Sequence, residues 1–330
     1  MGDIKGGRFC PQSIVRRKSL HWSANRLPSF SVNTNSSTTG AVLVAVSAVL
    51  FACKGTLIKY IYTLGASVTD LMVLRLWFSV PVYLWVAVRH WPRGEVRPAR
   101  SEWLGVIVSG VCGYYVASYF DMMGLELISV GLERIILYTY PAFVVLFSAW
   151  LFKRALSPSL LFYIALSYVG LFLVFYADIR VQPQMSIGAT IKGSLFVLVS
   201  ALTFAIYVIG GERSMRVMSS AMFTAVAMLS AAAMMTAHYL ALESPAQLRT
   251  LPASVYAWCV LLAIVFTVMP AFMLSAGIRR VGSAKAGGIG MVGPLATLLI
   301  AALVLDEQVT LMQIAGFMVV VVAIHRLHRA

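Results

Sequence analysis

Ten long apolar segments constrain the fold of this 330-residue chain more than any other feature. Each is close to the roughly 20 residues that a helix needs to cross about 30 Å of bilayer hydrocarbon. Only 12% of the residues are charged, whereas a soluble domain has about a quarter. Because a bilayer offers no water to unpaired backbone groups, the segments must be helical. We expect them at residues 41–61, 68–88, 103–123, 130–152, 159–177, 193–210, 221–242, 254–276, 284–305 and 311–325. The sequence thus predicts an all-α integral membrane protein.

The first 37 residues are rich in Ser, Asn, Arg and Lys and show no apolar periodicity, which predicts a flexible basic cytoplasmic tail. A basic tail before an apolar stretch can also be a signal peptide. Here the stretch continues past Lys54 to Tyr62 and nine more apolar segments follow, so we interpret it as a retained helix. The formal net charge of +14 does not indicate nucleic-acid binding, because the basic residues outside the tail lie in short clusters between apolar segments.

The sequence repeats itself at a constant offset of 153 residues. Gly and Pro match at this offset as well as apolar residues: Gly40 with Gly193, Ser47 with Ser200, Phe51 with Phe204, Gly124 with Gly277 and Pro141 with Pro294. We therefore predict two homologous five-helix halves, residues 38–180 and 188–328. An odd number of spans in each half makes the two halves inverted in the membrane, as in many secondary transporters.

The basic residues support this topology. With the N-terminus inside, eighteen Lys and Arg residues lie on the predicted inner side, and only Lys59, Arg180, Lys192 and Arg249 lie on the outer side. An excess of Lys and Arg marks cytoplasmic loops. We expect both termini to be cytoplasmic and the protein to lie in the plasma membrane, as the inner membrane of a bacterium.

Two parts of the sequence resemble one transporter family. The segment 282–288, then Gly293-Pro294 and then residues 305–310 are similar to the C-terminal helix pair of an EamA domain of the drug/metabolite transporter superfamily. Residues 129–134 followed by Tyr140-Pro141 resemble the matching part of the first half, and Arg75 resembles an arginine on that family's second helix. The resemblance spans residues 40–325 and implies transport of small metabolites by alternating access. It assigns the family's characteristic glutamate only to Glu307, since the first half has Lys153-Arg154 instead.

Ionisable residues within the apolar segments are candidates for function, because each costs about 2.5–3.5 kcal/mol to insert. Lys54 and Arg75 are candidate anchors for an anionic group of the substrate, and Glu133 and Arg134 are further candidates for substrate binding. Asp121 and Glu133 are candidates for proton coupling, because burial favours the neutral form of a carboxyl group. The alternative is that these charges only hold helices together, with Arg75 paired to Asp70 or Glu133.

The prolines of the two halves point to a central cavity. Pro141 and Pro294 interrupt equivalent helices, and paired interruptions mark substrate sites in transporters. Tyr138 stands near the first and Gly290 and Gly293 near the second, which predicts a tyrosine wall facing a glycine wall. The alternative for the glycines is close helix packing. Tyr115 and Tyr119 are expected to line the same space.

The sequence therefore favours a secondary transporter, most simply an exporter, of a small solute such as an amino acid, another metabolite or a drug-like molecule. The alternatives are a membrane-embedded enzyme and a passive channel. No P-loop, H-E-x-x-H or clustered cysteine motif is present, so we expect no cofactor and no metal. The expected partners are the lipid bilayer and the solute; a homodimer is a further expectation, and nucleic acid is not.

Overall fold

The computed structural model describes residues 34–91, 98–151, 158–181, 186–290, 292–304 and 310–327. The predicted tail at residues 1–37 lies almost entirely outside these residues, and Glu307 lies outside them as well. All regular secondary structure in the described part of the chain is helical.

Each of the ten predicted segments falls on helical backbone. The helices of the first half run α1 Thr34–Thr63, α2 Val68–Arg89, α3 Arg100–Gly110, η1 Val111–Val116, α4 Ala117–Leu127, α5 Val130–Leu137, α6 Tyr140–Leu151 and α7 Pro158–Val181. Those of the second half run α8 Ile187–Ser214, α9 Ser220–Leu242, α10 Pro245–Leu248, α11 Ala253–Ala263, η2 Ile264–Val268, α12 Met269–Val281, α13 Ser283–Gly290, α14 Val292–Val304 and α15 Leu311–Leu327.

Seven helices of the described ranges are long and apolar enough to cross a membrane, and two shorter apolar helices lie at Leu161–Ala177 and Leu311–Ala323. The described part of the chain is thus that of a multi-pass membrane protein, while the number of ten spans stays a prediction. Large apolar side chains such as Trp85, Trp150 and Leu303 are more than half exposed, as expected of groups that face lipid.

Helix boundaries recur at the same 153-residue offset as the sequence matches. Helices α3 and α11 begin 153 residues apart, as do α1 and α8, α5 and α13, and α7 and α15. The segments η1 and η2 are both π-helical, and they also begin 153 residues apart. π-Helical turns are rare and often lie at functional sites. Nothing in the local sequence predicted them.

The packing between helices repeats as well. Gly124 of α4 lies against Gly193 and Val197 of α8, with no room for a side chain. The equivalent Gly277 of α12 lies in the same way against Gly40 and Val44 of α1. Equivalent small residues of the two predicted halves therefore make equivalent close contacts with the other half.

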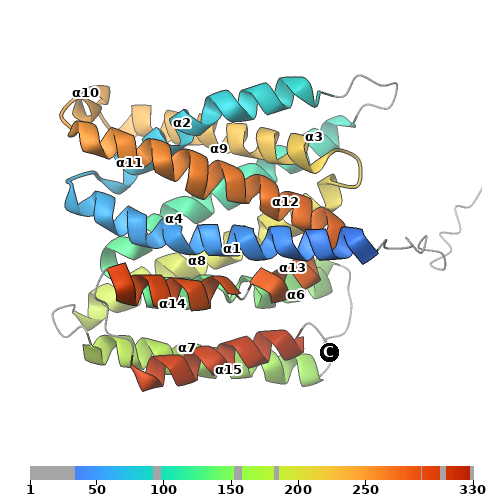
Figure 1. The fold of residues 1–330 in the computed structure, drawn as a ribbon, viewed down its shortest axis with the longest axis vertical. Helices are drawn as coiled ribbons and strands as arrows, with labels where there is room; N and C mark the ends of the chain where they lie inside the picture. Colours follow the sequence, from blue (N-terminus) through green and yellow to red (C-terminus); the bar gives the residue numbers. More distant parts are fainter. Residues whose placement is uncertain are drawn as a thin grey trace, which may run out of the picture. The chain divides into compact units, whose positions relative to one another are not determined.

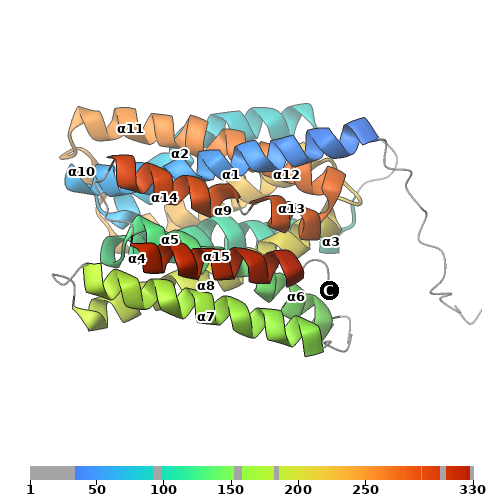
Figure 2. The same cartoon turned by 60° about the horizontal axis from the view of Figure 1, so that its bottom comes forward.

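The helices of residues 34–327 lie roughly alongside one another (Figure 1). Helices α7 and α15 form a close pair at one edge in both views (Figures 1 and 2), where the backbones at Gly170 and Gly316 touch. Figure 1 shows α1, α4, α8 and α13 between that pair and the group formed by α2, α9 and α11. These four helices and α5 contribute residues to the candidate site.

Candidate functional site

A cavity of about 80 Å³ lies among central helices of both halves. Water needs about 10–15 Å³ on this measure, so the cavity can hold several waters or a small solute. Its walls come from α1, η1, α4, α5 and α6 of the first half and from α8, α12 and α13 of the second. Both halves therefore contribute to one site.

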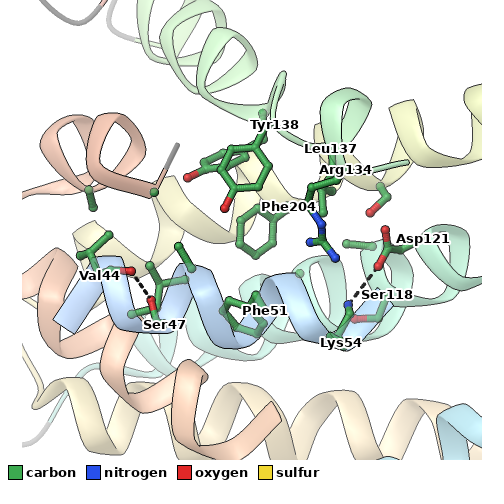
Figure 3. A pocket seen from close by; sticks show the side chains of 18 residues that line it. Val44, Ser47, Phe51, Lys54, Ser118, Asp121, Arg134, Leu137, Tyr138 and Phe204 are labelled. Atoms are coloured by element: carbon green, nitrogen blue, oxygen red, sulfur yellow. Dashed lines mark hydrogen bonds and ion pairs between the residues drawn. The ribbon is translucent and has the colours of Figure 1, made fainter. Parts of the chain in front are cut away.

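One end of the cavity is charged. Lys54 of α1, Asp121 of α4 and Arg134 of α5 line it, and all three are buried. Figure 3 shows the Lys54 ammonium and the Arg134 guanidinium at the same end of the cavity as the Asp121 carboxylate. Lys54 Nζ donates to Asp121 Oδ2 over 3.0 Å. Two cations and one carboxylate at this end give the lining an excess of positive charge.

Glu133 lies directly behind this end and is fully buried. Its Oε2 is 3.5 Å from Arg134 Nε, which makes an ion pair without a hydrogen bond. The Glu133 and Asp121 carboxyl groups are also close electrostatic neighbours. Asp121 Oδ1 and both Glu133 carboxylate oxygens have no donor in the described part of the chain. Two carboxyl groups form a hydrogen bond with each other only when one of them holds a proton.

The other end of the cavity is apolar and aromatic. Phe51 and Phe204 line it at repeat-equivalent positions, with Val44 beyond them and Tyr138 pointing in from α5 (Figure 3). Ser47 and Ser200 form a second equivalent pair, but Ser47 donates to its own helix at the Val44 carbonyl. A solute bound here would place an apolar part between the phenylalanines and a charged part near Lys54 and Arg134.

The predicted tyrosine and glycine walls do face each other. The Tyr138 hydroxyl lies where a side chain at Gly293 would have to be. The Tyr138 ring and the Tyr140 hydroxyl each lie 3.8 Å from the position of a Cβ on Gly290. Helix α5 ends at Leu137 and α6 begins at Tyr140, so the chain is interrupted just before the buried Pro141. The side chain of Pro294 lies outside the described side chains.

Three of the predicted site residues lie elsewhere. Tyr115 and Tyr119 contact His238 of α9, where the Tyr115 hydroxyl is 2.9 Å from His238 Nδ1, and neither lines the cavity. Arg75 does not line it either.

The predicted pairing of Arg75 with Asp70 or Glu133 is wrong for the described residues. Asp70 completes the N-terminal cap of α2 with Ser67 and accepts hydrogen bonds from Tyr239 and Gln247. Ion pairs form instead between Lys54 and Asp121 and between Arg134 and Glu133.

Sequence reasoning missed several lining residues, including Phe51, Ser118 and Phe204. The signal for two of them was present, because Phe51 and Phe204 match at the repeat offset and lie one turn from Ser47 and Ser200. Within the described ranges no group of three or more His, Cys, Asp or Glu side chains is placed to hold a metal ion.

Comparison with known proteins agrees with this architecture. The profile of the EamA-like transporter family matches residues 38–176 and again residues 191–325. The chain is 28% identical over 281 residues to the uncharacterized transporter YcbK of Bacillus subtilis, covering 84% of this chain and 88% of that protein. It is 24% identical over 316 residues to an uncharacterized transporter of Synechocystis sp., covering 86% and 92%. A crystal structure whose title names no function has the same fold, with a TM-score of 0.61, 16% identity and coverage of 89% of this chain and 95% of the other.

Proposed function

The chain belongs to the EamA-like transporter family, and from that premise we propose that it is a secondary transporter of a small solute that carries an anionic group. The solute crosses the plasma membrane by alternating access, and both termini of the protein are cytoplasmic. The two inverted halves, residues 38–180 and 188–328, rock about the central cavity.

One observation carries this proposal: the cavity between the halves has a cationic end and an apolar end. Lys54 and Arg134 suit a carboxylate or another small anionic group, because charge-assisted hydrogen bonds are the strongest polar contacts available. Phe51 and Phe204 suit the apolar remainder of the solute. The small volume favours a metabolite over a large drug-like molecule.

The paired π-helical segments support alternating access. Gly113 of η1 lines the cavity, and α12, which begins directly after η2, contributes Leu274. A π-helical turn strains the regular hydrogen-bond ladder and is a place where a helix can change its register. Two such turns at equivalent positions allow the halves to exchange conformations while the site stays assembled from both.

The proximity of Asp121 and Glu133 supports proton coupling. When the solute's anionic group binds Lys54 and Arg134, it competes with the two carboxylates for their cationic partners. The carboxyl pair then gains a proton, which returns to solvent when the solute leaves. Solute and proton thereby bind together and leave together, so the site couples their movement in the same direction.

Reconstituted proteoliposomes test this proposal. The purified protein is placed in liposomes loaded with an unlabelled solute, and entry of the same labelled solute is followed for a panel of small amino acids, hydroxy acids and amines. We expect saturable counterflow for an anionic or zwitterionic member of the panel, and weaker counterflow when Phe204 is replaced by Ala.

The two alternative functions give different results. A passive channel passes solute without saturation and without counterflow. A membrane-embedded enzyme converts a panel member into a new product, which mass spectrometry of the liposome contents detects. Either outcome overturns the transporter proposal.

A further inference from the structure

A wide groove lies outside the central cavity. It has a volume of about 700 Å³ and is lined mainly by α3, α6 and α8. Helices α3 and α6 each pack against α8, and all three belong to helices that are long and apolar enough to cross a membrane. The groove and the central cavity have no lining residue in common. The groove is therefore a separate feature of the membrane-spanning helices.

The walls of the groove are apolar and open outward. They include Leu104, Val108, Phe147, Trp150, Ile206 and Ile209. The exposed fraction is 80% for Trp150, 61% for Leu104 and 46% for Val108. Water between such walls finds no hydrogen-bond partners, whereas the hydrocarbon chains around a membrane-spanning helix suit them. We therefore expect a lipid chain in the groove.

Helices α3 and α8 run in opposite directions along the groove. Ser109 of α3 lies against Gly210 of α8. Four residues later, Gly113 of η1 lies against Tyr207, which comes three residues earlier in α8. The start of α3 and the end of α8 therefore lie at the same end of the groove. One apolar span begins at the start of α3 and another finishes at the end of α8, so this end lies at the membrane surface.

Two charged residues line the groove at this surface end. Glu102 comes seven residues before Ser109, and Arg213 comes three residues after Gly210. They lie about 10 Å and about 5 Å beyond that helix contact, in the same direction. Arg213 is exposed and forms no ion pair with any residue that the structure describes. Glu102 accepts a hydrogen bond from the backbone N–H of Ala99 and keeps its charge.

We propose that this groove binds one phospholipid whose headgroup carries a primary ammonium, a phosphatidylethanolamine. The phosphate accepts hydrogen bonds from the Arg213 guanidinium, the ammonium donates to the Glu102 carboxylate, and an acyl chain lies along α8 between α3 and α6. One cation and one carboxylate at the mouth match a zwitterionic headgroup, whereas Glu102 repels a purely anionic one. The exposed Trp150 is a residue type that membrane surfaces favour. The bound lipid ties α3 and α6 of the first half to α8 of the second.

Thermal unfolding of the full-length protein, purified in detergent, tests this site. Dioleoyl phosphatidylethanolamine is titrated in, and dioleoyl phosphatidylcholine and phosphatidylglycerol are the comparisons. A ligand that binds only the folded state raises the melting temperature in a saturable manner. The ammonium of phosphatidylcholine is methylated and donates no hydrogen bond, and phosphatidylglycerol has no ammonium. We expect both to bind about 5- to 10-fold more weakly than phosphatidylethanolamine, the effect of one lost hydrogen bond.

Variants of the two charged residues locate the headgroup. Arg213→Gln should weaken phosphatidylethanolamine about 10-fold, because it removes a charge-assisted hydrogen bond to the phosphate. Arg216→Gln is the matched control: Arg216 is also exposed but does not line the groove, and the variant should keep the wild-type affinity. Glu102→Gln should remove the preference for phosphatidylethanolamine over the other two lipids. Glutamine can replace glutamate in this helix cap, so the variant should fold.

A third variant locates the acyl chain. Gly105 lines the groove, and a Cβ at this position meets open space. Gly105→Leu should therefore fill the groove without a clash inside the protein. We expect it to fold and to weaken the binding of all three lipids at least 10-fold. If this variant does not fold, Arg213→Gln decides, because its side chain is exposed.

Two results overturn the proposal. One is a wild-type melting temperature that responds alike to the three lipids, as a general effect of lipid on the detergent would produce. The other is a phosphatidylethanolamine response that keeps its full affinity in Arg213→Gln or in folded Gly105→Leu, which would place the lipid elsewhere on the surface. Neither result bears on solute counterflow, so this site and the proposed transport function are tested independently.

Discussion

Lys54 Nζ lies 3.0 Å from Asp121 Oδ2 and joins α1 to α4 at the charged end of the central cavity. The two residues are 67 positions apart in the chain, and both are almost completely buried. The pair thus holds two helices of the first half together while it faces the solute space.

Removal of one member of this pair should destabilise the protein more than removal of both. Asp121→Asn leaves the Lys54 ammonium buried without its counter-charge, and we expect a loss of about 3–5 kcal/mol of stability. The double variant Lys54→Met with Asp121→Asn should recover most of that loss, because neither member of the pair is left as an uncompensated charge. Thermal unfolding in detergent measures both changes. If the double variant also fails in counterflow although it folds, the pair takes part in transport; equal stability of the single and double variants would contradict the ion-pair interpretation.

Glu133→Gln should remove proton coupling; because it also leaves Arg134 buried without its counter-charge, transport is measured on the folded fraction of the variant. Glutamine keeps the size of the side chain and leaves Asp121 as the only carboxyl group at this end, so the shared proton is lost. We expect solute transport driven by a pH gradient to fall at least 10-fold, while counterflow without a gradient persists. Transport assays in liposomes with and without an imposed pH gradient measure the two activities. An undiminished response to the gradient would show that Glu133 does not couple protons.

Gly293→Ala should be destabilising, whereas Gly290→Ala should be tolerated. A methyl group at Gly293 would occupy the position of the Tyr138 hydroxyl, but at Gly290 the nearest side-chain atoms are at 3.8 Å, an ordinary contact distance. Overpacking of this kind costs about 1–3 kcal/mol. The double variant Tyr138→Phe with Gly293→Ala removes the clashing oxygen and should recover part of the loss. Melting temperatures of the four proteins measure this, and equal effects at the two glycines would contradict the predicted contact.

The repeat symmetry should appear in the energetics. Gly124→Ala and Gly277→Ala each place a methyl group against the opposite half at equivalent contacts, and we expect similar losses of about 1–3 kcal/mol. Gly105→Ala on α3 has open space around its Cβ position and is the control. It should be neutral or slightly stabilising, since Ala favours helix over Gly by about 1 kcal/mol. Unfolding in detergent tests the three variants; a large difference between Gly124→Ala and Gly277→Ala would contradict equivalent packing.

Helix positions and the duplication could be predicted, because apolar segments and repeat matches can both be recognised along the sequence without knowledge of the packing. Apolar segments long enough to span a bilayer specify helices wherever they occur. The small residues Gly40 and Gly193 match in the sequence, and both lie at close helix contacts in the structure. Phe51 and Phe204 also match at the repeat offset in the sequence, but only the structure showed that they line the cavity.

The charge pairing and the π-helical segments were decided by tertiary structure. A hydropathy pattern places Lys54, Arg75, Asp121 and Glu133 at similar depths in the membrane. It does not determine how each helix is rotated about its axis, and this rotation decides which charged side chains form ion pairs. It places Lys54 and Arg134 in the lining of the cavity and leaves Arg75 outside that lining. The sequence by itself thus determined a duplicated helical membrane protein with buried charges. Only the packing of the two halves decided which charges meet, because an ion pair depends on distances of a few ångströms between residues far apart in the chain.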